Sequence, residues 1–475
     1  MLGWRFPSPA WEKTGIRSRT GTRAHPRRRG QRGRAGQRTA TVPGLRSEEA
    51  VSTTTKAPAA AHAPAERSRE VTETVTRIIA DVAERGDAAV QEWSARLDRW
   101  ERKSFRLDEA EIERIVASVP WPVLEDVRFS QAQVRRFAEA QRAAILDIEL
   151  ETFPGVTLGH RNIPIASAGS YVPGGRYPMV ASAQMGIVTA KVAGVERVAA
   201  CTPPLAGELP TATIAAMHLA GADEIYCLGG VHAITALALG TGTIQPVDFI
   251  AGPGNTYVVE AKRQLFGRVG IDLLAGPTEM LVVADETADA ELVAADLLGQ
   301  AEHGPTSPAI LVTTSWKLAG DVEREVARQL ESLPTADVAS VAWRDCGEIR
   351  VVGDDEEALR EADELAFEHV EVHTRDPDWY LTRLRNYGSL FLGETTTVAY
   401  GDKTIGTNHI LPTGRAARYT GGLWVGKYLK TVTYQHATRE ASVEIGEICA
   451  RQCRIENFEA HARSCDLRVD RWRTR

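Results

Sequence analysis

The sequence has few cysteines, no long apolar run and no overall excess of positive charge. Its 475 residues include six cysteines, and the only close pair is Cys449 and Cys453. This spacing matches neither a disulfide scaffold nor zinc fingers, so it predicts free thiols in a reducing, cytoplasmic environment. No stretch of about eighteen uncharged apolar residues is present, and no short apolar segment follows a basic start. We therefore expect no transmembrane helix, no secretory signal and no membrane partner.

Charge is divided unevenly along the chain. Residues 1–46 hold 12 lysines and arginines against one acidic residue, Glu12, although the whole chain has a formal net charge of −7. The rest of the chain is therefore acidic, and an acidic surface disfavours contact with phosphate. This balance argues against nucleic acid as the main partner of the folded part.

Residues 1–66 are expected to be a disordered head and linker. Residues 17–38 are mostly Arg, Gly, Gln, Thr and Pro without apolar periodicity, and residues 51–66 are rich in Ala, Thr and Pro. The composition favours a dispensable extension, such as one translated from an upstream start codon. An organellar transit peptide and a nucleic-acid-binding arm are the alternatives.

The apolar pattern after the head is typical of an α/β fold. An amphipathic helix is expected over residues 69–86, and more helix through about residue 142. From residue 165, short apolar runs alternate with helical stretches, which predicts parallel sheets covered on both faces. The expected strands are residues 198–201, 224–228, 247–250, 280–284, 309–313, 349–352 and 389–392. The polar tail after about residue 422 is expected to be helical and to wrap a neighbour.

Gln300 and His303 form the first candidate site. They lie three residues apart near the end of a predicted helix that Asp289 opens, so an amide oxygen and an imidazole nitrogen can contact one ion. The alternative is a buried, hydrogen-bonded pair with no ion, which the spacing alone favours.

Glu368 and His369 form the second candidate, at the junction of a predicted helix and strand. An adjacent carboxyl and imidazole can both move protons near neutral pH. Neighbours in a regular strand face opposite sides, so both serve one site only if the backbone turns there. A solvated pair at the end of an element is the alternative.

A third candidate is the glycine-punctuated run 401–412, which places Asp402, Asn408 and His409 in one expected loop. Such loops frequently carry binding sites. His461 follows Glu456 by five residues on the tail, where a lone histidine is usually just exposed.

Two glycine loops, 169–175 and 252–255, each sit beside a predicted strand. The second leads into a predicted helix over residues 256–265, whose free N–H groups suit a pyrophosphate. Neither loop is a dinucleotide fingerprint, and tight turns need glycine for steric reasons alone.

Taken together, these segments resemble the histidinol dehydrogenase family from about residue 67 to the end of the chain. The motifs, in family order, are Gly-Ser-Tyr-Val-Pro-Gly-Gly, Gly-Pro-Gly-Asn-Thr-Tyr-Val-Val-Glu-Ala-Lys-Arg, Ala-Gly-Pro-Thr-Glu-Met-Leu-Val, Gln-Ala-Glu-His, Glu-His, Gly-Thr-Asn-His-Ile-Leu-Pro-Thr and the His461 segment. Their joint occurrence in one order excludes a chance assembly.

The resemblance implies Zn²⁺ and NAD⁺ as cofactors. The implied metal ligands are Gln300, His303, Asp402 and His461, a nitrogen and oxygen set that suits Zn²⁺ or Mn²⁺. The implied acid–base residues are Glu368 and His369. Substrate binding is implied for Thr278, His409 and Glu456, together with His369 and the four metal ligands. NAD⁺ contacts are implied for Tyr171, Asn255 and His232; His232 stands where the family usually has Gln, and Thr278 where it usually has Ser.

The implied fold is two Rossmann-like parallel-sheet α/β units with small helical N- and C-terminal extensions, assembled as an intertwined homodimer. The first domain, with the catalytic and metal residues, is expected to comprise residues 67–170 and 278–421. The second domain, with the NAD⁺ contacts, is expected to comprise residues 171–277. Residues 422–475 would form a helical tail that contributes His461 and Glu456 to the other subunit's site.

The implied reaction is a zinc- and NAD-dependent four-electron oxidation of a primary alcohol to a carboxylate through a retained aldehyde. Neutral His369 takes the hydroxyl proton as hydride leaves, and Glu368 polarises the water that hydrates the aldehyde. The first expected substrate is L-histidinol, oxidised to L-histidine in histidine biosynthesis. Residues 304–308 and 418–430 depart from the usual sequence and look similar to a sulfopropanediol dehydrogenase branch. The alternative substrate is therefore 2,3-dihydroxypropane-1-sulfonate, oxidised to 3-sulfolactate.

A rival interpretation is a catalytically silent relative whose basic head binds nucleic acid. The intact acid–base pair and the four ligand types favour the enzyme instead. A metal-dependent rise in NADH absorbance on addition of an alcohol would distinguish the two.

Overall fold

The computed structural model describes residues 52–58, 65–174 and 178–473. The expected disorder of residues 1–51 and 59–64 lies outside the described residues. Within the expected linker, however, Thr53–Lys56 forms strand β1, which pairs antiparallel with β11 (Gly347–Val351). The linker prediction was wrong for this segment, because three β-branched threonines complete a sheet edge. Lys56 also lies over the ring of Trp343, 4.7 Å from its centroid.

Strands β4 to β8 form a five-stranded parallel sheet in the order β6-β5-β4-β7-β8. The strands are β4 (Ser167–Tyr171), β5 (Arg197–Thr202), β6 (Glu224–Cys227), β7 (Phe249–Ala251) and β8 (Gly270–Ile271). The helices between them are α5 (Val180–Ala193), α6 (Thr211–Ala220), α7 (Gly230–Leu239) and α8 (Thr256–Leu265). The alternation of strands and helices confirms the predicted parallel α/β architecture.

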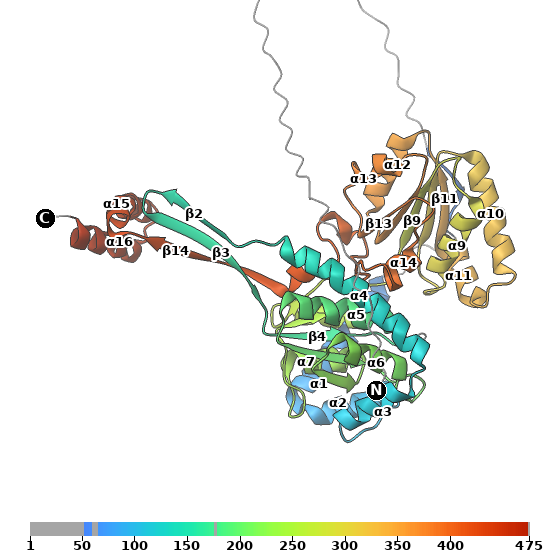
Figure 1. Ribbon diagram of the computed structural model, residues 1–475, viewed down its shortest axis with the longest axis horizontal. Helices are drawn as coiled ribbons and strands as arrows, with labels where there is room; N and C mark the ends of the chain where they lie inside the picture. The colour runs from blue at the N-terminus through green and yellow to red at the C-terminus, as the bar shows by residue number, and fades with distance from the viewer. Residues whose placement is uncertain (1–51, 59–64, 175–177, 474–475) are drawn as a thin grey trace, which may run out of the picture. The chain divides into compact units, whose positions relative to one another are not determined.

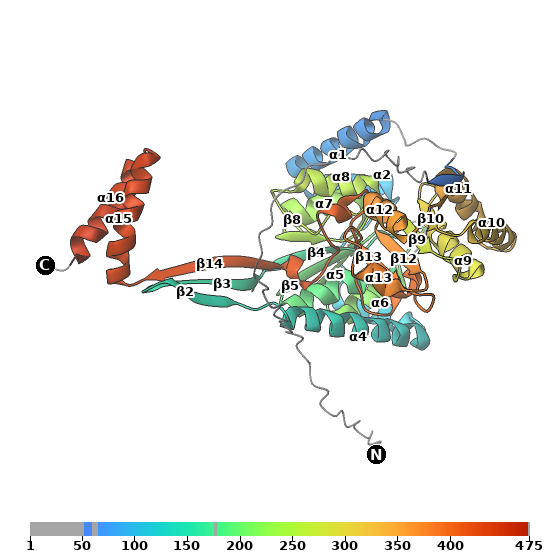
Figure 2. The same cartoon turned by 90° about the horizontal axis from the view of Figure 1, so that it is seen from above.

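Four further helices cover the same sheet. They are α1 (Ala65–Arg85), α2 (Asp87–Leu97), α3 (Glu109–Ser118) and α4 (Trp121–Ala143). α1 and α2 pack with α7 and α8 on one face, and α4 packs with α5 and α6 on the other (Figure 2). α3 packs on α6 and so covers the same face as α4. This corrects the expected grouping of residues 67–143 with residues 278–421. The amphipathic pattern predicted the helices but not which sheet buries their apolar faces.

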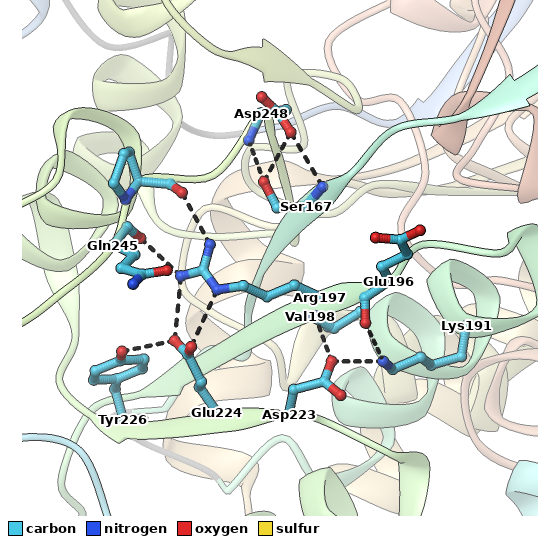
Figure 3. A network of polar contacts seen from close by, with 11 residues as sticks. Ser167, Lys191, Glu196, Arg197, Val198, Asp223, Glu224, Tyr226, Gln245 and Asp248 are labelled. Carbon is cyan, nitrogen blue, oxygen red and sulfur yellow. Dashed lines mark hydrogen bonds and ion pairs between the residues drawn. The ribbon is translucent and has the colours of Figure 1, made fainter.

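A polar network fixes the amino edge of this sheet (Figure 3). Arg197, the first residue of β5, pairs with Glu224 of β6 at 3.1 Å and donates to the carbonyl oxygen of Pro246 at 2.9 Å. At the start of β4, the Ser167 hydroxyl donates to Asp248, just before β7, at 2.8 Å. These contacts align the strands at the edge opposite to the carboxyl ends of β4 and β7.

The second sheet has the order β1-β11-β10-β9-β12-β13, with all strands parallel except β1. Its other strands are β9 (Met280–Ala284), β10 (Ala309–Thr313), β12 (His369–His373) and β13 (Ser389–Leu392). Helices α9 (Ala290–Ala301), α10 (Trp316–Leu330) and α11 (Ala336–Cys346) cover one face, and α12 (Asp355–Leu365) and α13 (Pro377–Leu381) cover the other (Figure 1). Because both faces are covered, strands such as β9 are continuous apolar runs, which is why the sequence predicted them.

A third, antiparallel sheet has the order β14-β3-β2 and joins residues far apart in the chain. Its strands are β2 (Ile148–Phe153), β3 (Val156–Pro164) and β14 (Leu429–Ala437). The prediction of a wholly helical tail after residue 422 was therefore wrong at β14. This strand is exposed along nearly all its length, so its sequence lacks the apolar alternation that marks a half-buried strand.

The tail continues as helices α15 (Arg439–Ile455) and α16 (Glu459–Trp472), which pack on each other. Large exposed apolar side chains gather on the third sheet and this helix pair: Ile148, Leu150, Val432, Tyr434, Ile448, Ile455, Phe458 and Leu467. Exposed apolar groups of this density are typical of surfaces that contact another protein chain.

The remaining short elements are α14 (Val398–Lys403) and two 3₁₀ turns, η1 (Ala416–Arg418) and η2 (Val425–Tyr428). Throughout the described ranges, every helix is too short or too polar to span a lipid bilayer.

Candidate active site

Glu368 and His369 lie at the amino end of β12. Helix α12 is followed by Ala366 in a left-handed conformation with φ of 51°, and Glu368 then precedes the first strand residue, His369. Strand alternation therefore does not separate the two side chains, and Nδ1 of His369 lies 3.7 Å from Oε2 of Glu368. The carboxyl and the imidazole share one site.

The Glu368 carboxyl is buried and hydrogen-bonded. Its Oε2 accepts the backbone N–H of Glu279 at 3.3 Å, and the carboxyl also bonds with the side chain of Thr278. Burial raises the pKa of Glu368 to about 7, although the nearby His369 opposes this shift. A carboxyl with this pKa can exchange protons near neutral pH.

The His369 ring has one nitrogen engaged and one free. Nδ1 lies 3.3 Å from the backbone oxygen of Glu279, which only accepts, so Nδ1 carries the hydrogen in this contact. Nε2 has no hydrogen-bond partner among the described residues and lies 3.7 Å from Oδ1 of Asp402. Burial alone would lower the pKa of His369, but Glu368 and Asp402 outweigh it and raise this pKa to about 9. When the ring is neutral, Nε2 is an available base.

Gln300, His303 and Asp402 line one cavity of about 400 Å³. Gln300 lies in the last turn of α9, and neither atom of its buried amide finds a hydrogen-bond partner in the part of the chain that the structure describes. Burial lowers the pKa of His303, which favours the neutral imidazole that binds metals. An orphaned amide, a neutral imidazole and a carboxylate fit a divalent cation.

Asp402 lies in α14 rather than in the expected loop, and His409 fixes its backbone. Nδ1 of His409 lies 2.9 Å from the carbonyl oxygen of Asp402, and Nε2 lies 2.9 Å from the hydroxyl of Ser182 on α5. His409 is buried, and burial lowers its pKa. Both of its ring nitrogens are thus held by the protein, so His409 ties α14 to α5.

Glu456 and His461 lie away from this arrangement within the chain. Glu456 is the C-cap of α15 and His461 lies on α16, and both side chains are exposed. Neither lines the cavity that contains Gln300, His303 and Asp402. Their implied roles remain predictions that need a second subunit.

The expected cofactor residues lie at the carboxyl edge of the first sheet. β4 and β7 are adjacent, but the chain proceeds from β4 towards β5 and from β7 towards β8, in opposite directions. Such a switch point is where parallel sheets bind ligands. Tyr171 ends β4, and Asn255, after β7, caps helix α8 by accepting two backbone N–H groups.

The loop after β7 is held by a buried ion pair. Lys262 on α8 pairs with Asp272, and both residues also bind Gly252. The Lys262 ammonium donates to the carbonyl oxygen of Gly252, and the N–H of Gly252 donates to Asp272, at 2.8 Å each. Gly252 has φ of 132°, and a Cβ there would lie 2.1 Å from the backbone oxygen of Tyr171. The switch point therefore requires glycine.

Replacing Gly252 with alanine should lower the midpoint of thermal unfolding. The new methyl group must displace β4 from β7, and backbone strain of this kind costs about 1–3 kcal/mol. Gly207→Ala is the matched control, because Gly207 also has positive φ but has open space around it. Thermal unfolding of both variants tests this, and equal midpoints would contradict the steric argument.

The structure places His232 differently from Tyr171 and Asn255. Its side chain on α7 is fully buried, and Nε2 lies 3.2 Å from Oδ2 of Asp98 at the end of α2. The hydroxyl of Tyr171 accepts the backbone N–H of Gly230 at 3.3 Å. The contact of His232 with NAD⁺ stays a prediction, and the burial of its ring argues against it.

Several buried polar residues near the site were not singled out from the sequence. Glu279 accepts the backbone N–H of Gly414 at 3.0 Å, and burial together with Glu368 raises its pKa to about 7. Glu371 and His373 share a strand face with His369, because side chains two apart on a strand point the same way. That period of two was the signal that could have identified them.

Comparison with known proteins identifies the class of protein. Residues 61–469 match the family model described as histidinol dehydrogenase. The chain therefore belongs to the histidinol dehydrogenase family, a family of oxidoreductases.

The similar proteins carry two different kinds of name. The chain is 62% identical over 403 residues to a "Histidinol dehydrogenase homolog" of Shouchella clausii. The aligned region covers 85% of this chain and 95% of that protein. It is 48% identical over 406 residues to "Sulfopropanediol 3-dehydrogenase" of Ruegeria pomeroyi, covering 85% and 93%. The crystal structure of histidinol dehydrogenase from Elizabethkingia anophelis superposes with a TM-score of 0.80 at 30% identity, covering 87% and 98%.

Proposed function

We propose that the chain catalyses the NAD⁺-dependent oxidation of a small primary alcohol to a carboxylate through a retained aldehyde. The observation that carries the proposal is the free Nε2 of His369, beside the buried Glu368 carboxyl and next to a cavity lined by Gln300, His303 and Asp402. Membership of an oxidoreductase family supports the same reaction class.

His369 and Glu368 have separate tasks in this scheme. Neutral His369 accepts the hydroxyl proton at Nε2 in each oxidation, while the Glu279 carbonyl holds Nδ1–H. Glu368, fixed by Thr278 and the Glu279 N–H, orients the water that hydrates the aldehyde. Both side chains are buried, which limits the access of bulk water to the two groups.

Two bound groups would complete the site. Gln300, His303 and Asp402, with His461 of a second subunit, would hold Zn²⁺, which supplies Lewis-acid stabilisation of negative charge on the substrate oxygen. Tyr171 and Asn255 would contact NAD⁺, which accepts hydride. The orphaned Gln300 amide supports the metal set, and the switch point between β4 and β7 supports the cofactor position.

We further propose a homodimer in which the tail of one chain completes the site of the other. The exposed apolar side chains of the third sheet and of α15 and α16 support a partner surface. The partner's His461 and the partner's Glu456 would then reach metal and substrate. We assign the enzyme to the cytoplasm, because its six cysteines are all free thiols.

Of the two candidate substrates, we favour 2,3-dihydroxypropane-1-sulfonate over L-histidinol. The relative with 48% identity is named for this substrate class. In addition, Arg415 and Arg418 are exposed on a turn whose Gly414 N–H binds Glu279, beside Thr278 and Glu368. A sulfonate is an anion whose oxygens can accept hydrogen bonds from such cationic guanidinium groups.

The substrate choice is tested by a panel with zinc and NAD⁺. We expect two NADH per sulfopropanediol oxidised to sulfolactate, and at least about 10-fold lower kcat/KM for L-histidinol, since one lost charged contact has this effect. The opposite ratio would assign L-histidinol. Turnover of neither alcohol, with salt-sensitive DNA binding by the full chain, would favour the nucleic-acid-binding alternative.

The rate should rise with pH. His369 acts as a base only when neutral, and its pKa is raised to about 9 because Glu368 and Asp402 outweigh burial. Protonation below its pKa removes the base, so kcat/KM should climb with rising pH. A cation bound to Asp402 opposes the raising effect of that carboxylate, so the plateau of the metal-loaded enzyme should begin below pH 9. Initial rates of NADH formation across this range measure it, and a rate that falls over the same interval would exclude His369 as the base.

A further inference from the structure

Three side chains beside the candidate site form a second, separate cluster of possible metal ligands. Glu371 and His373 follow His369 on the same face of β12, and Asp296 lies one helical turn before Gln300 on α9. One ligand atom from each of Asp296, Glu371 and His373 lies within 4.8 Å of the others. We call these three residues the β12–α9 cluster.

The two strand residues of the cluster are buried without adequate partners. Glu371 is 0% exposed and His373 is 2% exposed. In the part of the chain that the structure describes, neither Oε2 of Glu371 nor either ring nitrogen of His373 makes a hydrogen bond; Nε2 of His373 lies 3.4 Å from that oxygen. Buried polar atoms are normally satisfied, so these atoms point to a missing partner at the centre of the cluster.

The start of α14 orients both carboxylates. The backbone N–H of Val398 donates to Oε1 of Glu371, and the hydroxyl of Thr397 donates to Oδ1 of Asp296, at 2.8 Å each. One oxygen of each carboxylate is thereby fixed, which leaves the other for the cluster. Outer hydrogen bonds of this kind are characteristic of ligands that bind metals.

The occupant must be a cation. Asp296 and Glu371 bring two carboxylates together in a largely buried site, where little solvent screens their mutual repulsion. Glu394 also lies near His373, so the surroundings are negative as well. A divalent cation or a proton can relieve this repulsion, and the convergence of two oxygens and one imidazole is the donor set of Zn²⁺ and Mn²⁺.

The cluster also has an entry path. Asp296 is half-buried and lines the cavity of about 400 Å³ that contains Gln300, His303 and Asp402. A cation that reaches that cavity therefore meets Asp296, while Glu371 and His373 lie behind it in the interior.

We propose that Asp296, Glu371 and His373 bind a second divalent cation, Zn²⁺ or Mn²⁺, in addition to the cation of the proposed active site. This site does not depend on the proposed function, because it uses none of the same ligands. Through Thr397 and Val398 it would fix α14, the helix that carries Asp402.

The test is metal stoichiometry of the full chain, stripped with a chelator and reloaded with Zn²⁺ or Mn²⁺ alone. Elemental analysis should give two ions per wild-type subunit. His373→Gln and Asp296→Asn should each leave one bound ion per subunit. Chelator competition should show that each variant lowers the affinity of the β12–α9 cluster for its ion by more than about 10-fold, since even loss of an outer partner has an effect of this size. His303→Ala should remove the other ion.

The outcomes separate the two sites. One ion in wild type that His303→Ala removes and His373→Gln retains would overturn the proposal and leave a proton in the β12–α9 cluster. One ion that only His373→Gln and Asp296→Asn remove would support the cluster and count against the proposed catalytic metal set. Asp296 lines the cavity and is only half-buried, so Asp296→Asn tests the proposal even if substitution of the buried His373 prevents folding. Circular dichroism checks the folding of each variant.

Discussion

Replacing His369 with asparagine should lower kcat by about 10²–10⁴-fold, the usual contribution of a positioned acid–base group. The ring is 3.7 Å from Glu368 and from Asp402, and its Nε2 is the base of the proposed reaction. Asparagine retains a donor towards the Glu279 carbonyl but has no nitrogen that can accept the substrate proton. Single-turnover NADH formation measures the chemical step directly.

The control for this substitution is His218→Asn, because His218 is exposed on α6 and outside the site. It should leave kcat within experimental error of wild type. The KM for NAD⁺ should change little in either variant, since the expected cofactor residues lie on the other sheet. Full activity of His369→Asn would remove the central residue of the proposed mechanism.

The sequence predicted most of the two parallel sheets because their strands are buried on both faces. Continuous runs such as Met280–Ala284 and Ala309–Thr313 have no other stable location in a folded chain. By contrast β14 is exposed and β1 is a threonine-rich edge strand, so neither has an apolar signal. β14 pairs with β3 and β1 pairs with β11, and both pairings join distant parts of the chain, so the local sequence pattern does not indicate them.

The candidate site was predictable as a set of residue types but not as an arrangement. Local spacing predicted that Gln300 and His303 share a helix face, and both line the same cavity. It did not predict that Asp402 belongs to α14, because the surrounding glycines suggested a loop. For His232 the resemblance implies a cofactor contact, which stays a prediction. The structure adds that the ring is buried beside Asp98, a contact that no local pattern indicated.

Mixing two inactive variants should restore activity if the tail completes a partner's site. His461→Ala should lose catalytic zinc and activity, because it removes an implied metal ligand, and His369→Asn should lose the base. In a heterodimer of the two, one site has both defects. The other combines an intact His369 with the intact tail of the His369→Asn chain.

Random pairing makes half of the dimers heterodimers, and each heterodimer has one intact site out of two. The mixture should therefore recover about a quarter of wild-type activity. Co-expression with two affinity tags isolates the heterodimer, where about half of wild-type activity is expected by the same symmetry argument.

The matched control mixes His369→Asn with Glu368→Gln, which both alter the same part of the site and cannot complement each other. Recovery limited to the first pair requires His461 to act between subunits, because a histidine that served its own chain would leave every heterodimer site defective. No recovery in either pair would place His461 outside the partner's site, and its exposed position on α16 would then need another explanation.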